Sequence, residues 1–487
     1  MICIVVFVAA FVFNLYMDAR VGGGQSYRGS RSRGSGGGGG GGQALGLIIH
    51  LLFRYPYIGF PLLIFILYIV YKAKLANPMP DQEYSSLSSA PPAPANAIIN
   101  DNQVNQLQKE DTNFSMPLFL DFCQLLYANI FNFAAKHQLD KVKTYISDDV
   151  TVSVKKAWAG ISEIKDIIIG SLSISGIHLE KPDYNTIKIS LQTNYTVKLI
   201  EGGKWVTIYE RSTWSLSRKK GVISKGPGEI NRFGCPTCGG ALDDSSDGKC
   251  PYCGNTLDRG LTTWFLTNIY VAECTNQAPS AFGGYAPEVG TNDPTRFQPG
   301  ITEKLAAFKQ NYPDFKVEGF KQKVRHIFVK LQEAWTTHKW DKARPFETDQ
   351  LFQVHLYWIA LYKREQIRNV LSDIQVQAIE VVKIQKDAFF DAITVRIHAA
   401  MIDYTESFSG KLIDGSKTKP RHFTEYWTLI RHGGVKETDK TMDQCPNCGA
   451  ELNIGMVGKC GYCDSKITTG EFNWVLSLIE QDESYRG

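Results

Sequence analysis

Two stretches of the chain carry apolar residues at every third or fourth position, which is the spacing of one helix face. The apolar positions are Leu118, Phe122, Leu126, Ile130 and Phe133 in the first stretch, and Phe320, Val324, Phe328, Leu331 and Trp335 in the second. A further helix is expected from Phe352 to Ile367. Each helix should bury its apolar face against another layer of the fold.

Alternating apolar and polar positions follow both helical stretches and predict β-strands. In the second half of the chain they run from Ile374 to Ile384 and from Phe389 to Tyr404. We match these runs with Ile187 to Leu199 and Lys204 to Leu216 in the first half. The sequence therefore predicts helices followed by an antiparallel, curling sheet, twice over, in an α+β layer arrangement.

A four-cysteine motif is set into each half at the same internal spacing. Its members are Cys235, Cys238, Cys250 and Cys253 (ribbon one, residues 235–253), and Cys445, Cys448, Cys460 and Cys463 (ribbon two, residues 445–463). Two converging Cys-x-x-Cys turns supply the four thiolates that a tetrahedral structural Zn²⁺ takes, so we predict two structural zinc ions. A thioredoxin-like redox pair and disulfides are the alternatives, and the paired spacing favours metal over both.

The residue after the second cysteine of each turn also fits a metal-binding turn. It is glycine in three turns (Gly239, Gly254 and Gly449) and Asp464 in the fourth. Such a turn needs positive φ, which glycine adopts without a Cβ penalty.

Tryptophans flank both ribbons. Trp214 and Trp427 begin a Trp-x-Leu-x-Arg pattern before each ribbon, and Trp264 and Trp474 follow each ribbon. Because the flanking positions alternate, each ribbon is predicted to be an insertion at the tip of a β-hairpin whose strands carry these tryptophans. The four indoles could line a pocket, and core packing is the more frequent role for each.

The chain begins with an apolar run of signal-peptide length at residues 2–16. It lacks a basic start, so residues 1–19 are interpreted as a cleaved signal peptide with an uncleaved signal anchor as the alternative. Residues 20–43, rich in Gly, Ser and Arg, are expected to form a flexible tether, because they cannot bury a core.

A second apolar run, within residues 44–74, is long enough to cross the hydrocarbon of a bilayer. Arg54 and Pro56 interrupt it, which places the span itself from Tyr57 to Tyr71. The lysines that follow favour a cytoplasmic carboxyl-terminal side, whereas four arginines before the span argue the other way. We expect a single-pass protein of the cell membrane with cytoplasmic domains, since the zinc thiolates need a reducing space.

Composition indicates how many domains the chain has and which classes of partner it disfavours. The content of 43% hydrophobic and 12% aromatic residues is ample for folded cores. Residues 75–112 and 275–300 are expected to be linkers, the first disordered, which leaves two separately folding domains at 113–274 and 301–482. A net charge of +4 is too small to favour nucleic acid, and the ribbons lack a basic surface, so no nucleic-acid partner is expected.

The order of these features resembles the bacterial relatives of scaffold subunit forty-four of the mitochondrial inner-membrane translocase. The similarity lies in the signal-like start, the Gly/Ser/Arg run, one span, and helix-then-sheet units. It is strongest in the second half, in Phe328–Trp335, Trp340–Pro345 and Thr424–Leu429. The first half lacks the Ala-Trp and Arg-Pro pairs and matches weakly.

The resemblance implies a fold similar to nuclear transport factor two, a cone of helices closed by a curved antiparallel sheet around an apolar pocket. It also implies a membrane-attached scaffold that binds other proteins and acidic lipids. The doubled domain and the two zinc ribbons depart from the mitochondrial scaffold, so a specific role in protein import does not transfer.

A cone of this kind can also host an enzyme, because strands can direct polar side chains into its pocket. The candidates are His178, Tyr195 and Tyr209 in the first half and His398, Asp403 and Tyr404 in the second. None forms a pair whose spacing demands acid–base chemistry, so we expect no enzyme. A small-molecule-binding or enzymatic cone of hydrolase or isomerase type is the alternative.

The sequence therefore predicts a non-enzymatic, membrane-tethered scaffold that recruits a protein partner, acidic lipid or both. Arg218, Lys219 and Lys220 form a basic cluster that could meet anionic headgroups, with a solvated strand end as the plain alternative.

Overall fold

The structure is a computed structural model that describes residues 101–226, 249–250, 252–276, 290–436, 444–455, 458–482, 485 and 487. These residues belong to one compact unit of the chain. The predicted signal segment, the tether and the membrane span of residues 44–74 lie outside the described residues.

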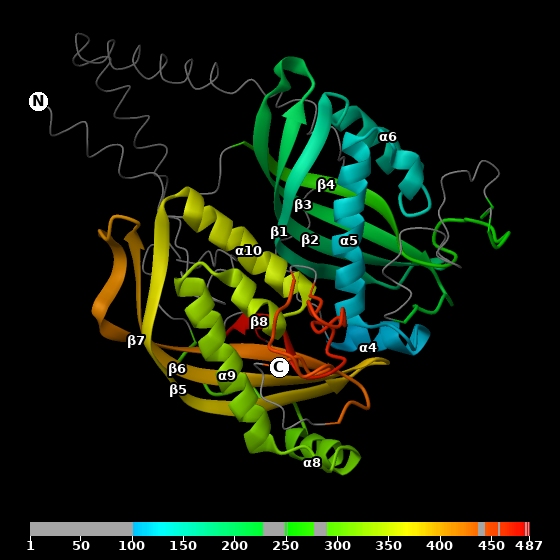
Figure 1. Cartoon of the computed structure of the whole chain (residues 1–487). Helices are drawn as coiled ribbons and strands as arrows, with labels where there is room; N and C mark the ends of the chain where they lie inside the picture. Colours follow the sequence, from blue (N-terminus) through cyan, green and yellow to red (C-terminus); the bar gives the residue numbers. More distant parts are fainter. Residues whose placement is uncertain are drawn as a thin grey trace, which may run out of the picture. The chain divides into compact units, whose positions relative to one another are not determined.

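Helices come first and strands second in the first half, residues 101–276 (Figure 1). Its helices are α4 (Asp101–Glu110), α5 (Met116–Ala135), the 3-10 turn η2 (Leu139–Val142) and α6 (Asp148–Ala157). Its strands are β1 (Ile161–His178), β2 (Tyr184–Leu199), β3 (Trp205–Lys219) and β4 (Phe265–Thr275), with the turn η3 (Glu201–Gly203) between β2 and β3.

The second half, residues 290–487, has the same order of elements. Its helices are α8 (Ile301–Asn311), α9 (Val317–Thr336), the 3-10 turn η4 (Trp340–Phe346) and α10 (Asp349–Arg364). Its strands are β5 (Ile367–Lys386), β6 (Phe390–Ser407), β7 (Leu412–His432) and β8 (Val475–Gln481).

Each half builds one four-stranded antiparallel sheet, in the order β1-β2-β3-β4 and β5-β6-β7-β8. Ribbon one lies in the sequence between the paired strands β3 and β4, and ribbon two between β7 and β8. Leu216 pairs with Leu266 in one sheet, and Leu429 pairs with Leu476 in the other. The predicted α+β class and the hairpin insertions are therefore correct.

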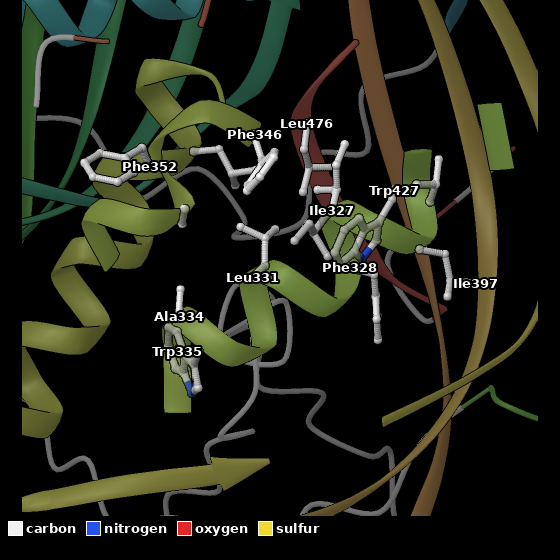
Figure 2. Packing of buried hydrophobic residues seen from close by; sticks show 14 of the residues in the cluster. Ile327, Phe328, Leu331, Ala334, Trp335, Phe346, Phe352, Ile397, Trp427 and Leu476 are labelled. Carbon is white, nitrogen blue, oxygen red and sulfur yellow. The ribbon is translucent and has the colours of Figure 1, made fainter. Parts of the chain in front are cut away.

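The second half buries the predicted apolar face of α9. Ile327, Phe328 and Leu331 are fully buried and lie beside Trp427 of β7 (Figure 2). The rings of Phe328 and Trp427 are 5.1 Å apart. Burial of these side chains is the main driving force for packing α9 against the sheet.

Helix α5 plays the same part in the first half. Tyr127 stacks on Trp214 at 5.1 Å and Phe131 on Trp158 at 4.7 Å. Among the described residues, α5 is the one helix long and apolar enough to cross a membrane, and about half of it is buried inside the protein. Its apolar composition is accounted for by its place in this core.

The two halves contact each other through α10 and β1. Gln350 Nε2 donates to the carbonyl oxygen of Leu172 at 2.9 Å, and Gln192 Nε2 donates to Tyr357 Oη at 3.2 Å. The Tyr357 ring covers Gly170, where a Cβ would come within 2.3 Å of it. The expectation of two separately folding domains did not include this interface. The lack of a side chain at Gly170 leaves room there for the Tyr357 ring.

Two details of the sequence analysis are wrong. Residues 101–110 form helix α4, whose Leu107 is fully buried, so the disordered linker cannot extend to residue 112. The strand matching also missed β1 and shifted each pair by one strand. Ile374–Ile384 belongs to β5, whose counterpart is β1 and not Ile187–Leu199 of β2. Bulges in β1 obscured its alternation.

Candidate metal centre

Ribbon two brings its four thiol sulfurs together. The Sγ atoms of Cys445, Cys448, Cys460 and Cys463 all lie within 4.8 Å of one another. The Cys445–Cys463 pair is 3.8 Å apart and the Cys448–Cys460 pair 3.9 Å. A tetrahedron with Zn–S bonds of about 2.3 Å has sulfur–sulfur edges of about 3.8 Å. The four cysteines therefore fit a tetrahedral metal ion.

The backbone of ribbon two forms the turns that this coordination needs. The amide of Gly449 donates to the Cys445 carbonyl at 2.8 Å, and the amide of Asp464 donates to the Cys460 carbonyl at 2.9 Å. Gly449 and Asp464 have φ of 75° and 57°. The predicted positive φ is therefore correct in both turns, and aspartate is among the residues that tolerate this region.

Amide groups also point at the sulfurs. The amide of Cys448 donates to Cys445 Sγ and the amide of Tyr462 to Cys460 Sγ, each at 3.5 Å. Hydrogen bonds from Ser465 and Asn447 lower the pKa of the Cys463 thiol to about 6. Such bonds favour the thiolate, which is the form that ligates a metal.

The visible part of ribbon one repeats this geometry. Gly254, with φ of 72°, donates its amide to the Cys250 carbonyl at 2.9 Å, and the Tyr252 amide donates to Cys250 Sγ at 3.4 Å. The Cys250 amide bonds to the Asn255 carbonyl, as that of Cys460 does to Ser465. Cys253 completes this turn, whereas the other predicted ligands, Cys235 and Cys238, lie outside the described residues.

Among the described residues of the second half, a small apolar cluster belongs to ribbon two. It consists of Cys445, Cys460 and Ile467, with Leu452, Ile454 and Cys463 packed at its edge. Small metal domains with cores of this kind depend on the ion to hold one conformation.

A cluster of charges joins ribbon two to the rest of the second half. Asp349, the first residue of α10, accepts bonds from Arg344, Lys466 and Thr468, the last at 2.9 Å. Burial alone would raise the pKa of Asp349, but Arg344 and Lys466 outweigh it and lower the pKa. The sequence analysis missed this cluster. Thr348-Asp349 before an apolar stretch signals the start of α10 but not the contact with Lys466.

The flanking tryptophans are core residues. Trp214, Trp427 and Trp474 are fully buried and Trp264 is 4% exposed. The Arg431 guanidinium lies 4.6 Å from the Trp474 ring, and that of Arg218 lies 4.4 Å from the Trp264 ring. The arginine of each Trp-x-Leu-x-Arg pattern therefore stacks on the tryptophan that ends the ribbon insertion.

This arrangement contradicts the headgroup role of Arg218. Its side chain is 2% exposed and pairs with Asp111 at 2.6 Å and with Ser224 at 2.7 Å. A buried, paired guanidinium cannot reach a lipid surface. Lys220 donates to the carbonyl of Leu179, and Lys219 is exposed.

The enzyme candidates of the first half are held by separate partners. Tyr195 Oη donates to the buried Glu210 at 2.9 Å, whereas Tyr209 bonds to Arg364 of α10. His178 lies 3.4 Å from Glu180 at the end of β1. They occupy three different strands, and these contacts lead each of them to a different partner.

The three candidates of the second half all lie on β6, and Asn369 Nδ2 donates to Asp403 and also to the Tyr404 carbonyl oxygen, the latter at 3.1 Å. His398 lies 3.1 Å from Glu380. Asp403 accepts from Asn369 at 2.7 Å, and Lys417 lies 5.0 Å from the Tyr404 ring. Structural polar residues in folded proteins commonly make contacts of this kind.

Exposed apolar side chains gather at the equivalent hairpin of each sheet. Between β2 and β3 these are Ile200 and Trp205, and between β6 and β7 they are Phe408, Leu412 and Ile413. Lysines flank both tips. The Lys165 ammonium lies 4.3 Å from the Trp205 ring, and Lys411, directly before Leu412, is exposed. Exposed apolar residues concentrated in this way mark contact surfaces more often than scattered ones do.

Comparison with known families identifies part of the chain. A Tim44-like domain is found at residues 302–442, which spans α8 to β7 and ends before the first cysteine of ribbon two. A search of the curated proteins finds no match. The Tim44-like domain fits a membrane-associated scaffold or binding role.

Proposed function

We propose that this protein is a non-enzymatic, membrane-tethered scaffold that recruits a protein partner, acidic lipid or both at the cytoplasmic face of the membrane. The observation that carries the proposal is the Tim44-like domain at residues 302–442. Tyr195 and Asp403 are engaged by buried neighbours, Glu210 and Asn369, which agrees with a binding role.

The first half would be a second, divergent copy of the same domain, and both would be cones like nuclear transport factor two. The equal strand order supports this, as do two matching contacts at the start of a helix. The Ser147 amide donates to the Leu266 carbonyl at 2.8 Å, and the Thr348 amide donates to the Leu476 carbonyl at 2.9 Å. Two linked domains raise the effective concentration of a second contact on the same partner.

Each ribbon would hold one structural zinc ion. In ribbon two the sulfur spacing and the closed set of four ligands support zinc over a catalytic metal. In ribbon one the Cys250 turn supports a second site that Cys235 and Cys238 would complete.

The tether would be the span of residues 44–74, after a cleaved signal at residues 1–19. The two lysine-flanked hairpin tips would contact the partner or the lipid. Tryptophan and lysine are a favourable combination at a membrane interface, and aromatic side chains anchor protein interfaces as well.

Site-specific photocrosslinking in the native membrane tests this function. A crosslinking residue at Leu412 or Trp205 should capture a reproducible protein or an acidic lipid. The same residue at Val152, which is also exposed but lies on α6, is the matched control. Capture at all three positions alike, or at none, would contradict a scaffold that binds through these tips.

A further inference from the structure

We infer that the metal of ribbon two controls the start of helix α10, through the bonds that Lys466 and Thr468 make to Asp349. We call this set of bonds the ribbon-helix clasp. The inference rests on the proposed metal site and adds a regulatory consequence to it.

The first step is the position of Asp349. It is the first residue of α10, directly after the N-cap Thr348, whose hydroxyl accepts from the Leu351 amide. Its carboxylate takes a bond from Lys466 on one oxygen and bonds from Thr468 and Arg344 on the other. A carboxylate at this position stabilises a helix, and cations that fix its orientation strengthen that effect.

The second step links the clasp to the metal ligands. Lys466 pairs with Lys459 in a short antiparallel bridge, and Lys459 directly precedes the ligand Cys460. The Cys460 amide donates to the Ser465 carbonyl at 3.0 Å. The segment that carries Lys466 is therefore part of the turn that the metal closes.

The third step is the close packing under the clasp. Gly458 has φ of 77°, and a Cβ there would lie 2.3 Å from Thr468 Oγ1 and 2.7 Å from Arg344 Nη2. The Ile467 amide donates to the Gly458 carbonyl at 2.9 Å. Because ribbon and clasp share this contact, loosening the ribbon displaces the donors of Asp349.

The first half contains a similar pair built from a different residue. Arg259, after ribbon one, makes two bonds to Asp148, at 2.6 and 2.8 Å. Asp148 is the first residue of α6, directly after the N-cap Ser147. Arg259 lies six residues after Cys253, whereas Lys466 lies three residues after Cys463. Two differently placed cations thus meet equivalent carboxylates.

The test is hydrogen exchange of the full chain, with and without a zinc chelator, and with bound zinc measured on the same samples. Chelation should speed exchange in the first two turns of α10 about fivefold or more in the original protein. In Lys466→Met the bound zinc should stay, exchange there should already be fast, and chelation should add little. The matched control is Lys459→Met, because Lys459 lies on the same bridge but pairs with the exposed Asp464. It should behave like the original protein.

The outcomes separate the inference from the metal proposal. If zinc leaves and exchange in α10 does not change, the metal stands and the clasp is overturned. If both lysine variants alter α10 equally, the effect is general and the clasp is again overturned. If the chain never carries metal, the proposed metal site and this inference both fail.

Discussion

The two ribbons contact their helices at sites that differ in solvent exposure. The Asp148 side chain is 84% exposed and meets one arginine, whereas that of Asp349 is 35% exposed and meets three donors. Exposed ion pairs contribute little to stability, and partly buried networks contribute more. We conclude that the ribbon is bound weakly to its helix in the first half and more strongly in the second, although both halves have the same order of elements.

The largest effect should come from removing one metal centre. Replacing both Cys445 and Cys448 with serine should release the metal of ribbon two and loosen the hairpin that holds Trp427 and Trp474. Metal content is measured by elemental analysis and the hairpin by tryptophan fluorescence. Cys274→Ser, away from both ribbons, is the control. An unchanged zinc content in the double variant would refute the metal site.

The core tryptophans Trp214 and Trp427 should contribute similarly to the stability of the two halves. Trp214→Ala and Trp427→Ala should each lower the free energy of unfolding by about 3–5 kcal/mol, because both side chains are fully buried. Urea denaturation measures the loss. A loss below about 1 kcal/mol in either variant would show that the indole is not part of a packed core.

Removing a buried arginine of the first half should cost more stability than removing an exposed one. Arg218→Ala leaves Asp111 buried without its cation and should lower the free energy of unfolding by about 3–5 kcal/mol. Arg259→Ala should lower it far less, since Asp148 is exposed and solvent screens the pair. Equal losses in urea denaturation would contradict the difference in burial.

The smallest effect concerns pH. Burial and the neighbouring Asp349 raise the pKa of Asp121 from 3.8 to about 7. The folded chain therefore holds a proton that the unfolded chain releases, so this group makes stability fall as pH rises from about 4 to 7. Asp121→Asn should remove that fall and raise the free energy of unfolding at pH 8 by on the order of 1 kcal/mol. The effect is small because the Asp121 side chain is only half-buried and solvent screens its charge. A pH profile parallel to that of the original protein would contradict this role.

Periodicity predicted the elements that bury one clear face. The apolar spacing located α5 and α9, and the alternation located most strands, because each of these elements has one face in a core. It missed β1, where bulges break the alternation, and α4, whose polar sequence hides one buried leucine.

Spacing along the chain predicted the cysteine site, because metal ligands come in local pairs. The clasp could not be predicted in this way, since Asp349 and Lys466 are far apart in the sequence and only the fold brings them together. Arg218 was misjudged for a related reason. Its neighbours in sequence are lysines, but its neighbours in space are Asp111 and Trp264.

The register of the two hairpins places both ribbons at the same point of their sheets. The last pair before ribbon one is Ser217 with Phe265, and the last pair before ribbon two is Ile430 with Val475, at equivalent positions. The chain leaves and re-enters each sheet on adjacent strands, so what lies between does not set the register. A ribbon transplanted to the other half would therefore meet the strands at the same point but lose the bond to its own helix, Arg259 to Asp148 or Lys466 to Asp349.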